Sequence, residues 1–214
     1  MKTGKTVKVL LALTTAAGML AGCGSKTDTD TFRFANDTDI VGMDSTVVDD
    51  AMSFNAITAI TDGLTTVDVK GNTIPGIAKS WDVSNNGLTY TFHLRDAKWA
   101  NGDDVTAQDF VYSWHRIIKN AGNYAYMLGS EGASIKNADS LINLGTAATD
   151  EQLNTLGIKA TDDKTVVVDL EKNVPYFVGL MSFPCYFPQN QKFVEKCGKK
   201  YATKPEYILG NGAY

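Results

Sequence analysis

Few side chains in this sequence have the types and spacing that catalysis or metal binding requires. The 214 residues include three cysteines and two histidines, His93 and His115. Neither histidine has a second metal ligand at useful spacing, and no CxxC motif or Cys/His cluster occurs. The G-x-S-x-G, H-E-x-x-H and P-loop motifs are absent from the sequence, and no base stands beside a plausible nucleophile. We therefore expect a protein that is not an enzyme and that binds no metal and no cofactor.

One cysteine, Cys23, follows a segment typical of exported proteins. Three lysines among the first eight residues give a positive start, and residues 9–20 are apolar. This apolar run of about 12 residues is shorter than the roughly 20 that span a bilayer as a helix. Residues 1–22 are therefore predicted to be a signal peptide.

The four residues that end at Cys23, Leu-Ala-Gly-Cys, resemble the lipobox of bacterial lipoproteins. In that family the cysteine is diacylated on its sulfur and becomes the first residue of the mature chain. The resemblance implies lipidation of Cys23 and a membrane location on the extracytoplasmic face, which is the cell surface in a Gram-positive organism. Residues 23–30 are polar and would form a flexible tether, and two acyl chains suffice for stable anchoring. An ordinary signal peptide with an incidental cysteine is the alternative.

The other two cysteines, Cys185 and Cys197, lie in a predicted loop and in the helix predicted after it. A disulfide between them is possible in an exported protein. The sequence leaves their relative geometry undetermined, and we favour free thiols.

The composition is that of a globular protein with one substantial core or two small ones, since 43% of the residues are hydrophobic and 21% are charged. The formal net charge is -4. The lysines of the predicted signal peptide contribute +3 to that total, so the remainder carries about -7. A negative balance argues against a nucleic-acid partner, because binding to phosphates requires a basic surface.

Alternating and helical patterns of apolar residues predict interleaved strands and helices. The predicted strands are Thr31–Asp37, one in residues 64–78 that is followed by a Gly-Asn turn and an extended exit with Pro75, two around an Asn86-Gly87 type I′ turn in residues 81–95, and two around Asp162-Asp163 in residues 158–172. The predicted helices are one in residues 49–64 that Gly63 stops, one from Ala107 to about Lys119, one capped by Thr149 and Gln152, one opened by Pro175, and one from about Gln189 to Gly198. This order predicts an α/β or α+β fold with one mixed sheet.

The helix that begins at Ala107 has the clearest signals. Thr106 is a favourable N-cap, and Asp109 three residues later completes an approximate capping box. Trp114 belongs to the apolar stripe of this helix and is expected to anchor the core. Trp81 and Trp99 are likewise expected to pack inside the protein rather than to stack on a ligand.

Several motifs resemble the extracytoplasmic oligopeptide-binding proteins of peptide ABC importers, solute-binding protein family 5. They are the run GLTTVDVKGNTIPGIAKSWDVSNNGLTYTFHLR, then WANGDDVTAQDFVYSWHR, VPYF and GNGAY, in the same order as in the family. Each motif is short, but the set is specific, and the resemblance covers essentially residues 31–214.

The resemblance implies a two-lobed periplasmic-binding-protein-like class II fold of which this chain holds only a part. Residues 31–61 and 184–214 would be part of the first lobe, and residues 62–183 would be a domain inserted into it. The second lobe would be absent, so the sequence is expected to be the N-terminal part of a longer binding protein.

Members of this family resemble a clamp that closes two lobes over an extended peptide. Matching motif positions imply three ligand contacts. Asp49 and Ala51 fall on an extended stretch, TVVDDAM, that hydrogen-bonds the peptide backbone, and Tyr124 matches a tyrosine that lines the groove. For Asp49 a solvated loop and for Tyr124 simple packing remain the alternatives.

The implied function is a lipid-anchored, peptide-binding component of an ABC importer, with the permease subunits as partners. Three alternatives stay open: a binder of the same fold for a nickel complex, haem, a sugar or a signalling peptide, a genuinely short relative, or a truncated remnant without binding function.

Overall fold

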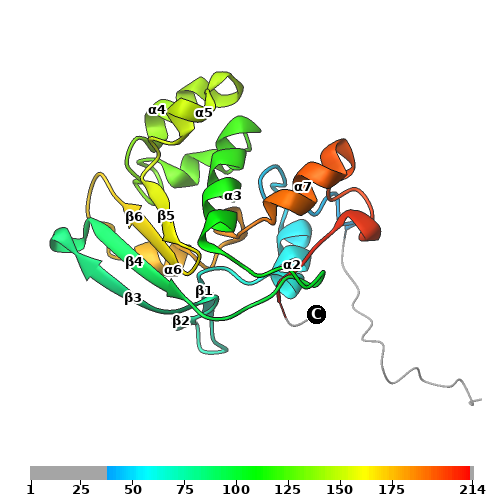
Figure 1. Ribbon diagram of the computed structural model, residues 1–214, viewed down its shortest axis with the longest axis horizontal. Helices are drawn as coiled ribbons and strands as arrows, with labels where there is room; N and C mark the ends of the chain where they lie inside the picture. The colour runs from blue at the N-terminus through cyan, green and yellow to red at the C-terminus, as the bar shows by residue number, and fades with distance from the viewer. Residues whose placement is uncertain (1–37, 213–214) are drawn as a thin grey trace, which may run out of the picture. The chain divides into compact units, whose positions relative to one another are not determined.

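The computed structural model describes residues 38–212 of the chain (Figure 1). Cys23, the predicted strand Thr31–Asp37 and the last two residues lie outside the described residues. The helices within it are α2 (Ala51–Ile60), α3 (Ala107–Lys119), α4 (Ala138–Leu144), α5 (Asp150–Leu153), α6 (Phe177–Leu180) and α7 (Gln191–Cys197). None of these combines the length and the apolar character that a bilayer-crossing helix requires.

The strands of residues 38–212 form two antiparallel sheets. Strands β1 (Thr65–Val67) and β2 (Thr73–Pro75) pair only with each other. The larger sheet has the order β3-β4-β6-β5 and is built from β3 (Ala78–Ser84), β4 (Thr89–Leu94), β5 (Ile158–Asp162) and β6 (Thr165–Asp169).

The prediction of one mixed sheet is therefore wrong for the described residues. Both predicted hairpins form, β1 and β2 make a further one, and a tight turn permits only antiparallel pairing of the strands it joins. The central pair β4–β6 is antiparallel as well, with Phe92 opposite Val166, so no strand is added in parallel.

The turn between β3 and β4 confirms the predicted type I′ geometry. Asn86 and Gly87 both have positive φ, 55° and 84°, and the Leu88 N–H donates to the Asn85 carbonyl oxygen at 3.1 Å. A type I′ turn needs positive φ at both central positions, which asparagine and glycine tolerate best. The turn sets the register in which Ser84 pairs with Thr89.

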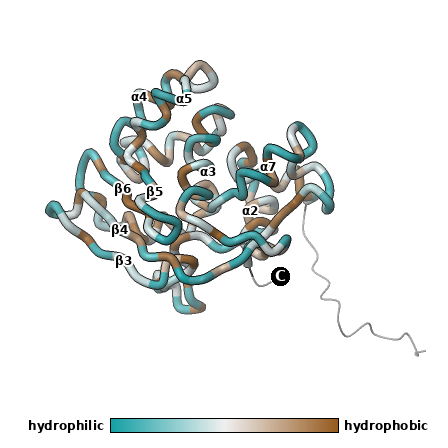
Figure 2. The backbone as a smooth tube through the Cα atoms, in the orientation of Figure 1, coloured by the Kyte–Doolittle hydropathy of each residue, from teal (hydrophilic) through white to brown (hydrophobic). Residues whose placement is uncertain are grey.

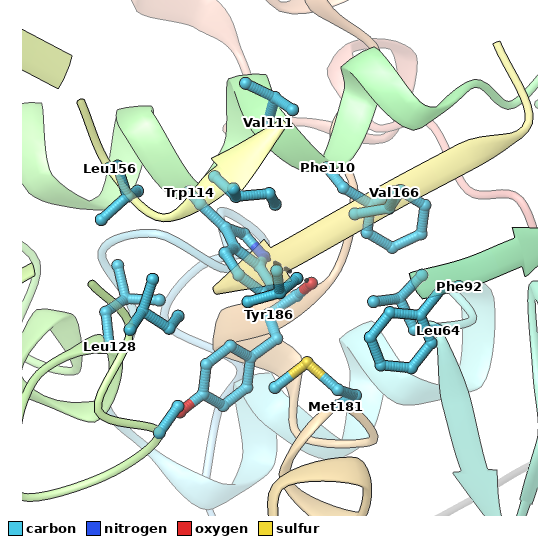
Figure 3. Packing of buried hydrophobic residues seen from close by; sticks show 14 of the residues in the cluster. Leu64, Phe92, Phe110, Val111, Trp114, Leu128, Leu156, Val166, Met181 and Tyr186 are labelled. Atoms are coloured by element: carbon cyan, nitrogen blue, oxygen red, sulfur yellow. Dashed lines mark hydrogen bonds between the residues drawn. The ribbon is translucent and has the colours of Figure 1, made fainter. Parts of the chain in front are cut away.

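Helix α3 begins and ends where the sequence predicts. The Thr106 N–H donates to the Asp109 carboxylate at 2.9 Å, the reciprocal contact of a capping box. The apolar stripe of the helix faces β5 and β6, and Phe110 and Trp114 are fully buried (Figure 3). Helix α3 therefore lies between the four-stranded sheet and the segments that pack on the other side of the helix.

Two helix boundaries differ from the prediction. Helix α2 ends at Ile60, before Gly63, because the Asp62 N–H donates to the side-chain oxygen of Asn211 at 2.7 Å and not to a carbonyl oxygen of the helix. Helix α6 is a single turn rather than the longer helix expected after Pro175. Helix α7 starts one residue after Asn190, whose side chain accepts from the Phe193 N–H.

Buried residues form one large cluster around α3 and the four-stranded sheet, and a smaller one of Val48, Phe54, Ile57 and Phe187. The backbone coloured by hydropathy alternates between hydrophobic and hydrophilic stretches along the chain (Figure 2). Cys185 and Cys197 are both free, as predicted, and Cys185 is buried.

Candidate functional site

The structure brings two of the three predicted ligand residues together. The Asn123 side chain donates a hydrogen bond from Nδ2 to the Asp49 carboxylate, and Asn123 directly precedes Tyr124. The Asp49 side chain is exposed, and Tyr124 is half-buried. Asp49 therefore lies at the surface beside the loop that carries Tyr124.

Ala51, the third predicted residue, is the first residue of α2. Asp50 caps this helix, because its Oδ1 accepts from the Ser53 N–H at 2.8 Å. Hydrogen bonds from Ser53 lower the pKa of Asp50, so the cap is ionised and complements the positive helix end. Within residues 38–212 the Ala51 N–H has no hydrogen-bond partner, as is usual in the first turn, and Ala51 is exposed.

Much of the predicted extended stretch around Asp49, residues 46–52, is not extended in the structure. The N–H groups of Val47 and Val48 both donate to the Asp44 carbonyl oxygen at 3.1 Å, which closes a turn. The chain becomes helical at Ala51. Only Asp49 and Asp50 lie between this turn and the helix.

The Tyr124 ring belongs to an aromatic cluster, as the packing alternative predicted. Its centroid lies 5.0 Å from that of Phe54, in edge-to-face geometry, and 5.3 Å from that of Phe183. The Tyr126 ring stacks on it at 5.8 Å, and Tyr126 is exposed. Such contacts fix the orientation of an aromatic ring. Tyr124 therefore combines a packed face with an accessible remainder.

A polar cluster centred on buried Asp44, Thr46 and Gln189 adjoins the Asp49 segment. We call it the Arg116 cluster, and its other members are the partly buried Arg116 and the exposed Asn120. Arg116 Nη1 donates to Asp44 Oδ1 at 2.7 Å, to Thr46 Oγ1 at 2.9 Å and to Gln189 Oε1 at 3.0 Å. Gln189 Nε2 donates to Asp44 Oδ1 at 3.0 Å, and Asn120 Nδ2 donates to Thr46 Oγ1 at 2.8 Å.

The charges of this cluster are mutually stabilised. Burial by itself would raise the pKa of Asp44, but the hydrogen bond and charge of Arg116, with Thr46 and Gln189, outweigh it and lower the pKa. Burial likewise opposes the charge of Arg116, and Asp44 outweighs that effect and raises the pKa of the guanidinium. Both groups are therefore ionised inside the protein, a state that requires the complete set of partners.

Several of these residues carry no signal in the sequence. Arg116 and Asp44 are 72 positions apart, and Gln189 is a further 73 positions along the chain from Arg116. Nothing in local spacing joins them. Asn123 could have been found from its place next to Tyr124, whereas Phe54 and Phe183 look like ordinary core residues.

Within residues 38–212 neither histidine hydrogen-bonds to Asp49 or Tyr124. His93 Nε2 lies 2.8 Å from Asp82 Oδ2 on the exposed sheet face. His115 Nε2 is buried without a partner among the described residues, and burial lowers the pKa of His115 against a weaker opposing effect of Asp150. Across residues 38–212 no three His, Cys, Asp or Glu side chains are grouped as metal ligands would be.

Two hollows of the described surface lie away from the predicted ligand residues. One, of about 360 Å³, lies between α3, α5 and α7 and is lined by His115, Arg116 and Glu195 among others. Another, of about 670 Å³, lies beside Arg95 and Asn211. The exposed Asp49 and Ala51 thus form an open surface rather than the wall of either hollow.

Comparison with known sequences places the chain among solute-binding proteins. Residues 72–214 match the family described as bacterial extracellular solute-binding proteins, family 5 Middle. The chain is 40% identical over its whole length to the dipeptide-binding protein of Lactococcus lactis subsp. cremoris, of which it covers 38%. It is 37% identical over 98% of its length to the periplasmic oligopeptide-binding protein OppA of Salmonella typhimurium, of which it covers 37%.

Comparison with solved structures likewise places the chain among solute-binding proteins. The substrate-binding domain of an oligopeptide ABC transporter from Bacillus anthracis superimposes with a TM-score of 0.77 and 38% identity over 85% of this chain, which corresponds to 34% of that structure. OppA of Listeria monocytogenes bound to peptide gives a TM-score of 0.73 and 38% identity over 80% of this chain, which corresponds to 33% of that structure. The chain thus has the fold of these proteins over about a third of their length.

Proposed function

Because the chain belongs to family 5 of the bacterial extracellular solute-binding proteins, we propose that it is the substrate-binding component of an oligopeptide ABC importer. Its ligands are extended peptides, and its partners are the permease subunits of the importer. The observation that carries this proposal is the 40% sequence identity, over the whole chain, with a relative named as a dipeptide-binding protein.

The three predicted ligand residues offer complementary groups to such a peptide. The Ala51 N–H can donate to a peptide carbonyl oxygen, and the second Asp49 oxygen can accept a peptide N–H. Tyr124 supplies a fixed aromatic surface beside them. Main-chain hydrogen bonds of this kind bind peptides independently of their sequence, and side chains in hydrated pockets tolerate variety.

Peptide recognition in this proposal depends on two lobes, which form the two walls of the binding cleft. Residues 31–61 and 184–214 contribute part of the first lobe, and residues 62–183 form the inserted domain. The second wall belongs to a second lobe, for which the relatives, of which this chain covers 37–38%, have ample length. A cleft that removes most of the ligand surface from water needs both walls, so the 214 residues alone should bind peptide weakly or not at all.

The membrane location in this proposal comes from Cys23. Lipidation of its sulfur would hold the folded residues on the extracytoplasmic side through the tether 23–30, within reach of the permease. The polar composition of that tether and the lipobox-like residues before it support the proposal.

A chimera tests the peptide-binding function. The 214 residues replace the matching region of the Lactococcus lactis dipeptide-binding protein, and calorimetry measures binding of a mixed di- to pentapeptide library. The chimera should bind peptide, and Tyr124→Ala should weaken binding by about tenfold, within the range of 1–3 kcal/mol typical of a central aromatic contact. Val69→Ala is the matched control, because Val69 is fully exposed on the β1–β2 turn.

Loss of all peptide binding in a chimera that remains folded would contradict the proposal. Micromolar peptide affinity of the 214 residues alone would contradict the requirement for two walls.

A further inference from the structure

The predicted ligand residues Asp49 and Tyr124 stand at the ends of two segments that dock side by side. One segment is 44–49, and the other is 116–124. Their last contact is the hydrogen bond from Asn123 to Asp49. The separation of Asp49 from Tyr124 therefore depends on how segment 44–49 is held against α3 and the loop that follows it.

The docking leaves no space between the two segments. A Cβ atom at Gly122 would lie 2.0 Å from the Thr46 carbonyl oxygen, so only glycine permits this approach. Thr46 Oγ1 accepts from both Asn120 and Arg116 in the same place. The backbone of segment 44–49 thus rests directly on the end of α3.

Arg116 is the centre of these contacts. Its Nη1 reaches segment 44–49 at both Asp44 and Thr46, and it reaches Gln189 in the segment before α7. Side-chain exposure is 19% for Arg116 and 11% for Asp44, so the pair is largely withdrawn from water and the loss of one partner is costly. The guanidinium also lies over the Tyr201 ring, 5.1 Å from its centroid.

We propose that Arg116 is a positioning residue of the ligand site: it fixes segment 44–49 through Asp44 and Thr46 and so sets Asp49 and Ala51 relative to Tyr124. The ligand in this inference is the peptide of the proposed function, but the positioning itself is a property of the free protein. In this inference Arg116 acts on the ligand site through segment 44–49 and not by contact with the ligand.

The guanidinium has two features that lysine lacks. It is a planar, delocalised cation that lies over the Tyr201 ring, and its Nη1 at the same time reaches Asp44, Thr46 and Gln189. An ammonium at position 116 retains the charge beside Asp44 but not this combination. Arg116→Lys should therefore fold and hold the segment less well, whereas Arg116→Met also leaves Asp44 as a buried unpaired charge.

Hydrogen exchange on the full chain tests the positioning. The Val47 and Val48 N–H groups report on the segment, because both are bonded to the Asp44 carbonyl oxygen. In Arg116→Lys their exchange should accelerate by about tenfold, the effect of losing roughly one net hydrogen bond. Arg116→Met should accelerate it further.

Arg95→Met is the matched control. Arg95 also pairs with a carboxylate, Asp62 at 3.3 Å, and donates to the Gly76 carbonyl oxygen, but it touches no member of the Arg116 cluster. Its removal should leave the exchange of Val47 and Val48 unchanged. Unchanged exchange in both Arg116 variants would overturn the inference, as would equal acceleration in β4 and β6, which would mean general destabilisation.

The peptide-binding chimera separates this inference from the proposed function. If the chimera binds peptide, Arg116→Lys should lower its affinity by about tenfold with little change in melting temperature. If the unmodified chimera binds no peptide, the proposed function fails while the exchange result still decides the role of Arg116.

Discussion

The indole of Trp114 and the backbone of Tyr186 are joined in the centre of the protein. Trp114 Nε1 donates to the Tyr186 carbonyl oxygen at 3.0 Å, and the two rings meet edge to face with centroids 5.6 Å apart (Figure 3). Both residues have no exposed surface. This contact ties α3 to the segment after α6, across 72 residues of chain.

Trp114→Phe should destabilise the protein by about 2–4 kcal/mol, because it removes the indole, opens a cavity and leaves a buried carbonyl oxygen without its donor. Urea unfolding followed by circular dichroism measures the loss. Trp81→Phe is the control, since Trp81 is only half-buried on β3, and it should cost less than about 1 kcal/mol. Equal stability of Trp114→Phe and the wild type would contradict this assignment.

Asp109 should affect stability in a pH-dependent way. Burial raises the pKa of Asp109, and hydrogen bonds from Thr106 and Trp99 oppose that effect only in part. A carboxyl whose folded pKa is raised contributes stability at low pH that is lost as pH rises through the folded value. The wild type should therefore gain stability relative to Asp109→Asn as pH falls from 7 toward about 3.8, the ordinary pKa of this group.

Two substitutions separate the hydrogen bonds of Asp109 from its charge. Asp109→Asn keeps an acceptor for Thr106 and Trp99 and should cost less than about 1 kcal/mol at pH 7. Asp109→Ala leaves both donors unpaired and should cost about 1–3 kcal/mol. Urea midpoints at several pH values measure both effects, and a pH-independent difference between wild type and Asp109→Asn would refute the raised pKa.

The two thiols of the described residues should differ in reactivity. Burial raises the pKa of Cys185 well above its ordinary value, and its side chain is inaccessible, whereas Cys197 is half-buried. In a Cys23→Ala background, a thiol reagent should label one site in the native protein and two after denaturation. Peptide mapping should identify the native site as Cys197, and rapid native labelling of Cys185 would contradict the packing described.

Cys23→Ala should move the protein from the membrane fraction to the soluble fraction of the producing cells, because the acyl chains would be lost. Immunoblotting of separated fractions measures this partition. Cys197→Ala is the matched control and should stay with the membranes. Unchanged partition of Cys23→Ala would rule out lipidation as the anchor.

Much of the fold follows from short-range signals in the sequence. The Asn86-Gly87 turn, the capping box at Thr106 and the limits of α3 all appear as predicted, because each depends on residues fewer than about five positions apart. The end of α2 and the shortness of α6 were not predicted. The α2 boundary depends on Asn211, which lies 149 positions from Asp62.

The candidate site likewise depends partly on local sequence and partly on the tertiary structure. Short motifs singled out Asp49, Ala51 and Tyr124, and their role as ligand contacts stays a prediction. The tertiary structure alone placed Asp49 beside the Tyr124 loop and assembled the Arg116 cluster from three distant segments. The sequence by itself determined most of the elements and the family, because propensity and motif act over a few neighbouring residues. Only the folded chain decided which buried charges meet, because the free energy of burying Asp44 and Arg116 depends on partners that no local pattern specifies.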